Sequence, residues 1–397
     1  MNLAPPVAVT GIGCICAPGP NLTACLDSML AGKGGPLPPG RFACHQPQML
    51  PVFEVPADWT APYTDTTHTQ SIALLICACD QALRQARINT AEGSGQRIGV
   101  VIGTSVGASL DFLEYYRAHK AGSIPDLAPI RSYMRSNPAE FLSRHLDLTG
   151  PALTVTNACS SGADALGIAC SWIRQGFCDI VLAGGTDALS EISYNGFARL
   201  MISSPEPCRP FDCDRKGLNL GEGAAVMVLE GGRKRGAAIK GSILGYGTCC
   251  DAHHLTAPHP EAMGLKQAVH DCLHRSGLTP KDIGFINVHG TATANNDVVE
   301  GLLLREMFPN TPFSATKGFT GHTLGAAGAI EAAFTLACLS LDELPPSKGF
   351  SKVDPAIGLA PVATRTAIQA RYALSLSLAF GGINSALVLE RGDVPCV

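Results

Sequence analysis

One cysteine and two histidines in this chain have the types and positions that acyl-transfer chemistry needs. Cys159 follows a β-branched, strand-like run at 153–156 and precedes an alanine-rich, helix-like segment that continues to about Gln175. We therefore expect Cys159 at a helix N-terminus, where the helix dipole and free backbone N–H groups lower a thiol pKa and offer donors to a developing oxyanion. The alternative is a buried cysteine that packs as a small apolar side chain.

The two halves of the chain resemble each other, and this repeat relates the cysteine to a histidine. Four segments of the second half match four of the first in the same order, namely 242–252 with 7–17, 282–293 with 97–105, 314–334 with 154–167, and 383–392 with 224–232. The local match aligns 158–163 with 321–326, which pairs Cys159 with His322. A duplicated βαβ unit about a pseudo-twofold axis would bring these two turns together, although similar Gly/Ala-rich helix starts could also produce the match.

His289 ends another strand-like run, 283–288, just before a turn at Gly290. A single histidine there is usually structural, but its strand matches one that ends at the same face of the sheet in the first half. We therefore expect Cys159, His289 and His322 to face one cavity. A cysteine with two imidazoles suits thioester chemistry, because the imidazoles can act as a base or as Nε2–H donors to the thioester carbonyl.

The composition predicts a compact two-part protein. At 397 residues the chain exceeds the usual size of one hydrophobic core, and we divide it into halves 1–235 and 236–397. The 46% hydrophobic residues, 43 glycines and 16% charged residues exclude a disordered chain, and the net charge of -4 argues against nucleic-acid binding. We expect no membrane span, because Gly, Ser or charged residues interrupt the apolar runs before about 18 residues.

The 16 cysteines show neither zinc-site spacing nor a disulfide framework. His270, Cys272 and His274 fall on one expected helix, and no acidic or cysteine partner stands beside them with ligand spacing, so we expect no metal site. The N-terminus has no charged region followed by an apolar one, as a secretory signal would. We therefore expect reduced cysteines and a cytoplasmic location.

Several longer motifs identify a family. They are the nucleophile turn at 156–162, HGTATANND (289–297), KGFTGHTLGAAGAIE (317–331), FDCDRKGLNLGEGAA (211–225) and AFGGIN (379–384). Over nearly its whole length the chain resembles the β-ketoacyl-[acyl-carrier-protein] synthases of the thiolase superfamily, closest to the elongating I/II group. The resemblance implies an α/β thiolase-like fold, in which two pseudo-duplicated βαβαβαββ halves form a five-layer αβαβα sandwich.

The same resemblance implies a reaction and assigns residues to it. The reaction is a decarboxylative Claisen condensation of a cysteine-bound acyl chain with malonyl carrier protein, which gives a 3-oxoacyl carrier protein in fatty-acid, polyketide or aryl-polyene biosynthesis. Cys159 would carry the acyl chain, while His289 and His322 would bind the malonyl thioester carbonyl and promote decarboxylation. The remaining implied residues are Lys317 and Glu331 beside the histidines, the backbone N–H groups of Cys159 and Phe380 as an oxyanion hole, Thr256, Thr291 and Thr293 along the pantetheine tunnel, Phe380 as an acyl gate, and Val106 and Phe197 in the acyl pocket.

The implied partner is an acyl carrier protein, loaded with an acyl or a malonyl group. No separate cofactor is expected, because phosphopantetheine arrives on that carrier. A homodimer is expected from the family, with a heterodimer containing a related subunit as the alternative. Two other functions stay open, which are a non-condensing acyltransferase or decarboxylase and a catalytically silent carrier-binding subunit.

Related activities lack support in the motifs. A degradative thiolase needs a second cysteine near AFGGIN, starter enzymes that use acyl-CoA have asparagine where His322 stands, and a chain-length partner subunit has lost the cysteine. Two departures from the family pattern are informative. Ala379 replaces the first glycine of the gating turn and should restrict backbone motion there. The stretch 63–69 lacks the basic residues that dock an acidic carrier, with only Arg131, Arg135 and a few others nearby, so we favour a specialised carrier over a drifted loop.

Overall fold

The computed structural model describes residues 5–42, 46–64, 69–90, 95–105, 107, 113–127, 130–131, 137–231 and 236–397. Ten strands within these residues hydrogen-bond in the order β3-β2-β4-β5-β1-β6-β12-β11-β7-β8. The strands of the first half are β1 (Val7–Cys16), β2 (Ile98–Gly103), β3 (Ala152–Val155), β4 (Ile180–Asp187) and β5 (Gly223–Glu230). Those of the second half are β6 (Gly241–Cys250), β7 (Ile283–Asn287), β8 (Phe313–Ser314), β11 (Tyr372–Ala379) and β12 (Ile383–Arg391), with β9 (Glu343–Leu344) and β10 (Thr366–Ala367) in a separate pair.

The strand order confirms the internal repeat. Reading inward from each end, β3-β2-β4-β5-β1 in the first half corresponds to β8-β7-β11-β12-β6 in the second. The two five-stranded units join where β1 pairs with β6 in antiparallel fashion over three residue pairs, Val7 to Val9 against Gly241 to Ile243. Both units thus place the carboxyl ends of their parallel strands, where ligands bind in α/β sheets, beside the centre of the molecule.

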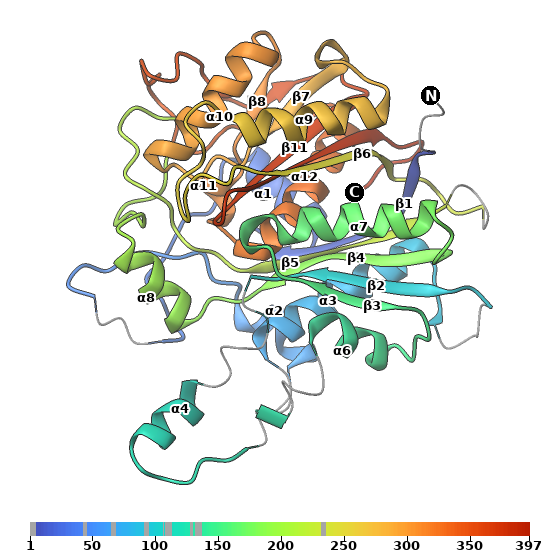
Figure 1. Ribbon diagram of the computed structural model, residues 1–397, viewed down its shortest axis with the longest axis vertical. Coiled ribbons are helices and arrows are strands. Elements are labelled where there is room, and N and C mark those ends of the chain that lie inside the picture. Colours follow the sequence, from blue (N-terminus) through green and yellow to red (C-terminus); the bar gives the residue numbers. More distant parts are fainter. Residues whose placement is uncertain are drawn as a thin grey trace.

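Helices form three layers around these strands (Figure 1). Helices α7 (Ser161–Arg174) and α12 (Ala327–Leu341) lie between the two units, α3 (Gln70–Ala86) and α6 (Pro138–His145) cover the outer face of the first, and α9 (Met263–Ser276) and α10 (Ala294–Met307) cover that of the second. The result is the expected αβαβα sandwich. Shorter helices are α1 (Leu22–Leu30), α2 (Ala57–Thr60), α4 (Leu113–Lys120), α8 (Glu191–Arg199) and α11 (Lys317–Thr320), with 3-10 turns η1 (Ala61–Tyr63), η4 (Ala158–Ser160), η5 (Pro280–Asp282) and η6 (Leu324–Ala326).

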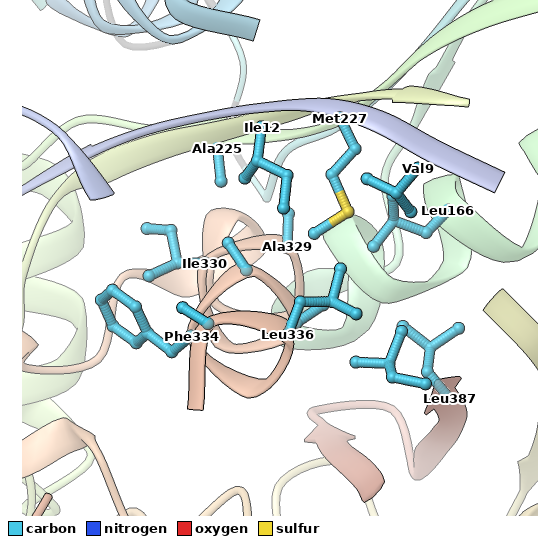
Figure 2. Close-up of a cluster of buried hydrophobic side chains, with 14 of the residues drawn as sticks. Val9, Ile12, Leu166, Ala225, Met227, Ala329, Ile330, Phe334, Leu336 and Leu387 are labelled. Atoms are coloured by element: carbon cyan, nitrogen blue, oxygen red, sulfur yellow. The ribbon is translucent and has the colours of Figure 1, made fainter. Parts of the chain in front are cut away.

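The core between the sheets depends on large side chains from strands and small ones from helices. Figure 2 shows Ile12 and Met227 pointing from the first sheet toward Ala329 and Leu336 of α12. Each large side chain buried here contributes about 1.5–3 kcal/mol. Alanine and glycine on α7 and α12 let the two helices approach closely, because a Cβ on Gly162 would lie 2.8 Å from the backbone nitrogen of Ala329.

One segment has the length and mean hydropathy of a membrane-spanning helix, although glycines, a serine and a charged residue interrupt its apolar run as expected. Leu324–Leu341 has 18 residues with a mean hydropathy of 1.7, despite the glycines and Glu331 that it contains. This segment forms η6 and α12 in the central layer, and 89% of it is buried within the protein. Its hydropathy is that of a core helix enclosed by sheets on both sides.

Candidate active site

The turn that presents Cys159 is strained and held by side chains. Ala158, just before the cysteine, adopts a left-handed backbone with φ of 49°, which is unfavourable for a residue with a Cβ. The Ser161 hydroxyl accepts a hydrogen bond from the Asn157 N–H at 2.7 Å and donates one to the Ala158 carbonyl at 2.7 Å. These bonds fix a sharp path from β3 through η4 into α7, which leaves Cys159 buried at 5% exposure.

His322 meets the cysteine from the other half of the molecule. Its Nε2 lies 3.0 Å from Cys159 Sγ, a distance suited to proton transfer between thiol and imidazole. The backbone of His322 is fixed on both sides, because its N–H donates to the Asn219 carbonyl and its own carbonyl accepts from the Gly221 N–H. The predicted convergence of Cys159 and His322 is thus present in the structure.

His289 lies beside His322, with ring centroids 5.2 Å apart and planes nearly perpendicular at 87°. Lys317 Nζ is 3.2 Å from His289 Nδ1 and donates to the His289 carbonyl at 2.5 Å. The same ammonium group forms an ion pair with Glu331, and both side chains are almost fully buried. The four residues from the second half therefore form one connected group next to the cysteine, as the resemblance implied.

Burial dominates the electrostatics of this group. It raises the pKa of Cys159 to about 11, against the opposing backbone hydrogen bond from Phe380 and the charge of Lys317. The expected lowering of the thiol pKa was therefore wrong, because desolvation at this buried turn outweighs the donors near the helix N-terminus. Burial, followed by the charge of Lys317, also lowers the pKa of His289 and His322 well below 6.5, so both imidazoles are neutral at pH 7.

The group opens into a cavity of about 310 Å³. Phe197 and Phe380, which line it, stack with ring centroids 5.7 Å apart, and Phe197 also packs edge-on against His322 at 6.4 Å. Five of the implied substrate contacts line the cavity, namely Phe197, Thr256, Thr291, Thr293 and Phe380. Val106 lies outside the described residues, so its predicted place in the acyl pocket stays a prediction.

Comparison with known proteins agrees with this geometry. Residues 4–234 match the family model "Beta-ketoacyl synthase, N-terminal domain", and residues 240–351 match "Beta-ketoacyl synthase, C-terminal domain". The chain belongs to the β-ketoacyl synthase family. A curated relative, 3-oxoacyl-[acyl-carrier-protein] synthase 2 of Synechocystis, is 33% identical over 411 residues, covering 97% of this chain and 98% of the relative.

Two solved structures of similar shape come from assemblies that contain a ketosynthase. The ishigamide ketosynthase/chain length factor superposes with a TM-score of 0.91 at 28% identity, covering 97% of this chain and 99% of that one. A ketosynthase in complex with its chain length factor, from Xenorhabdus doucetiae, gives a TM-score of 0.82 at 30% identity, covering 97% and 98%. As a β-ketoacyl synthase, the chain is an acyltransferase of the condensing-enzyme type.

The repeat in this synthase has a different local register from the one that the sequence suggested. The left-handed residue and the 3-10 turn before α7 begin at Ala158, whereas those before α12 begin at Leu324. Structurally, Cys159 therefore corresponds to Gly325, and His322 lies three residues earlier. The two active-site turns do meet, but the alignment of Cys159 with His322 was wrong by three residues.

Acidic residues on α10 support His289, and the sequence analysis missed them. Glu300 accepts the backbone N–H groups of His289 and Gly290, each at 2.7 Å. Asp297 accepts the N–H of Ala292 at 3.2 Å, which fixes the following turn. Burial raises the pKa of Glu300 to about 8 and that of Asp297 to about 6. Asp297 and Glu300 lie on one face of α10, but that spacing is common to any amphipathic helix, so the sequence did not mark them as supports for His289.

The gating turn accommodates Ala379 without strain in this conformation. Ala379 ends β11 in antiparallel pairing with Ile383, and the left-handed residues of the turn are Gly381 (φ 86°) and Gly382 (φ 80°). The Asn384 amide joins this turn to the loop at 251–260 by donating to the Asp251 carboxylate at 3.0 Å. The expected restriction of an opening motion by Ala379 concerns another conformation and stays a prediction.

The predicted carrier-docking region is only partly described. Residues 65–68 and Arg135 lie outside the described residues, while Arg131 is exposed. Among the described residues that line the cavity, Arg215 and Lys216 carry guanidinium or ammonium groups. Arg215 pairs with Asp354 at 2.5 Å, and Lys216 pairs with Glu206 at 2.6 Å. Their charges are thus already engaged within the protein.

Proposed function

We propose that this chain condenses a Cys159-bound acyl group with a malonyl group carried by an acyl carrier protein, and releases CO₂ and a 3-oxoacyl carrier protein. The observation that carries the proposal is the 3.0 Å contact between Cys159 Sγ and His322 Nε2, with His289 alongside in the same cavity. One half of the molecule supplies the nucleophile, and the other supplies the polar groups that a thioester carbonyl needs.

In the loading step, the Cys159 sulfur attacks the acyl thioester while its proton passes to His322 Nε2. A neutral imidazole is needed for this transfer, because the thiol pKa is about 11. The carbonyl oxygen becomes an oxyanion, and the backbone N–H groups of Cys159 and Phe380 are its proposed donors. The pantetheine thiol of the carrier leaves with the proton, and the acyl group stays on sulfur.

In the condensing step, His289 and His322 donate hydrogen bonds from Nε2–H to the malonyl thioester carbonyl, so His322, whose Nε2 is unprotonated when it takes the thiol proton in loading, acts here as the Nε2–H tautomer. The C–CO₂⁻ bond breaks, CO₂ leaves, and the electron pair forms an enolate whose oxygen these donors stabilise. The enolate carbon then attacks the acyl carbonyl, and Cys159 leaves as the thiolate. Lys317 fixes the His289 ring through Nδ1 and the backbone carbonyl, so that Nε2 is the nitrogen free to face substrate.

The carrier would deliver its substrate through the mouth of the cavity. Thr291 and Thr293, whose hydroxyls lie 2.9 Å apart, offer hydrogen bonds to the amides of a pantetheine arm, and Thr256, which also lines the cavity, offers another. No resident cofactor enters this scheme, because the arm is covalently part of the carrier. The cytoplasmic location expected from the cysteines stays a prediction.

A second subunit would add to the sheet at β3. This strand ends the ten-strand order, and Ala152 and Leu153 are exposed there, with Leu153 at 38%. An open strand edge favours pairing with another chain. We propose a homodimer through β3. The named complexes of ketosynthases with chain length factors support a heterodimer with a related subunit as the alternative.

Intact-protein mass spectrometry tests the proposal. The protein is mixed with carrier proteins that bear acyl chains from short and saturated to polyunsaturated, and is then chased with malonyl carrier. We expect an acyl adduct on Cys159 and a carrier-bound product two carbons longer, with the preferred chain distinguishing fatty-acid from specialised pathways. Cys159→Ala is the control and should give neither species. A wild-type protein that alkylates normally at Cys159 but accepts no acyl chain would overturn the solo-enzyme proposal.

A further inference from the structure

The buried carboxylate of Asp164 receives four side-chain donors from both halves of the protein. Asp164 lies in the first turn of α7 and is 2% exposed. Its Oδ2 accepts from Asn157 Nδ2 and from the Ser160 hydroxyl, each at 2.8 Å. Its Oδ1 accepts from the Tyr246 hydroxyl at 2.9 Å and from the Ser385 hydroxyl. Each carboxylate oxygen thus accepts two hydrogen bonds, which is an unusually complete set of donors for a carboxylate in a protein core.

The Oδ2 side of this carboxylate fixes the nucleophile turn. Asn157 and Ser160 flank the strained Ala158 and the nucleophile Cys159, and the Ser160 hydroxyl also lies 3.0 Å from the Asn157 carbonyl. A left-handed alanine persists only where its surroundings determine the backbone path. Asp164 supplies two of those constraints, so it helps to set the direction of the Cys159 N–H.

The Oδ1 side fixes the strands that carry the other oxyanion donor. Tyr246 belongs to β6, and Ser385 belongs to β12 just after the turn that holds Phe380. Ser385 pairs with Ser377 across the β11–β12 hairpin and with Thr248 of β6, so its position is locked to the strand that leads into Phe380. Burial, followed by the charge of Asp164, raises the pKa of the Tyr246 phenol, which keeps its hydroxyl protonated as a donor.

We propose that Asp164 is a positioning residue that holds the Cys159 and Phe380 N–H groups in register as one oxyanion hole. One donor comes from each half of the chain, and this carboxylate is bonded to both supports. The inference rests on the oxyanion role given to those two groups under the proposed function. A hydrogen-bond network with a purely structural role would be equally buried, so the test must separate oxyanion stabilisation from folding.

Two reagents make that separation at Cys159. Acylation by p-nitrophenyl acetate forms an Sγ–C bond through a tetrahedral oxyanion, expels p-nitrophenolate and passes the thiol proton to His322. Alkylation by iodoacetamide displaces iodide from carbon and forms no oxyanion. Both rates are measured at the Cys159 peptide by mass spectrometry. For Asp164→Asn we expect acylation to fall by about 100-fold, as for a displaced catalytic group, while alkylation changes by less than about threefold.

Two further variants keep the test decisive if Asp164→Asn folds poorly. Tyr246→Phe retains the carboxylate and removes one donor, and it should lower acylation by about fivefold with normal alkylation. Glu230→Gln is the matched control, because Glu230 is a buried carboxylate that accepts from Thr10 at 2.6 Å, at the opposite end of β5 from the site. It should lower thermal stability without changing the ratio of the two rates.

An unchanged ratio in both Asp164→Asn and Tyr246→Phe would overturn the positioning role. The same holds if the ratio falls equally in Glu230→Gln, since destabilisation alone would then explain it. The proposed function fails separately, when wild-type protein takes an acetyl group from p-nitrophenyl acetate but no acyl group from any carrier. That result leaves the effect of Asp164 on the ratio measurable.

Discussion

The turn before α7 and the turn before α12 have the same backbone but different chemistry. Each begins with a left-handed residue that has a Cβ, Ala158 with φ of 49° and Leu324 with φ of 53°, and each passes through a 3-10 turn into a central helix. The position after the left-handed residue is Cys159 in one turn and Gly325 in the other. A Cβ at Gly325 would lie 2.4 Å from the Ser105 nitrogen, so that turn has no space for a side chain.

The comparison teaches that the repeat supplies geometry rather than duplicated active groups. The first turn carries the nucleophile Cys159. The second turn has Gly325 at the equivalent position and packs closely against the backbone of Ser105. His322 lies three residues before Gly325. Asp187 joins the second turn to the segment that follows β2, because its carboxylate accepts the N–H groups of Gly325 at 2.6 Å and Ser105 at 2.8 Å. One copy of the unit has thus become a support for the other.

The strongest test of this division replaces the functional side chain of each half. Cys159→Ala should abolish acyl loading, because no other described residue that lines the cavity has a thiol. His322→Ala should still load, but about 10²–10⁴-fold more slowly, since it removes only the base. Intact-protein mass spectrometry of reactions quenched at a series of times, with one acyl carrier, measures the loading rate of both variants. Equal and complete loss in both would show that the halves do not divide the roles in this way.

A second test measures the symmetry of the helix contact. A Cβ on Gly162 would lie 2.8 Å from the Ala329 nitrogen, and a Cβ on Gly328 would lie 2.7 Å from the Ala163 nitrogen. Alanine at either glycine should therefore lower the free energy of unfolding by a similar amount, about 1–3 kcal/mol. Urea denaturation provides the measurement, with Gly196→Ala as control, because a Cβ there meets nothing within 4 Å. Strongly unequal losses would argue against the revised register.

Burial of His322 in the second half should also lower the free energy of unfolding at acid pH. Burial lowers the pKa of His322 below 6.5, so the unfolded chain binds a proton that the folded chain cannot. The stability present above that pH is lost as the pH falls, by up to about 1.4 kcal/mol per pH unit for one group. The free energy of unfolding of wild type should fall more steeply below pH 6.5 than that of His322→Gln. If the two proteins lost stability in parallel as the pH fell, the pKa of His322 would not be lowered by folding. Titration of Glu331 affects both proteins and therefore does not contribute to the difference between them.

The smallest effect is expected at the gating turn of the second half. Ala379 occupies ordinary strand geometry, and the left-handed angles fall on Gly381 and Gly382. Ala379→Gly should therefore cost about 0.5–1 kcal/mol of stability through added backbone freedom. It should change acyl loading by no more than about threefold. A much larger gain in loading of long acyl chains would show that Ala379 restricts opening of the gate.

The internal repeat predicted two related halves and the meeting of Cys159, His289 and His322, whereas the thiolase-like fold was expected from the resemblance to the β-ketoacyl synthases. The repeat could not set the local register, because the run 321–329 contains glycines at 325 and 328 that both align with Gly162. Nor could it predict the thiol pKa, since desolvation depends on what packs over the turn. Asp164 and Glu300 look like ordinary acidic residues on amphipathic helices, and only their tertiary partners reveal what they hold in place.

The apolar character of α12 has a consequence for biosynthesis. The chain is made from its N-terminus, so α7 and the first sheet exist before Leu324–Leu341 leaves the ribosome, whereas β11 and β12 do not. For that interval only one side of the helix has a partner, although its 18 residues and mean hydropathy of 1.7 match the length and composition of a membrane-spanning helix. Because the first half is made before this helix, we expect a folded first half to cover part of its apolar surface until β11 and β12 are complete.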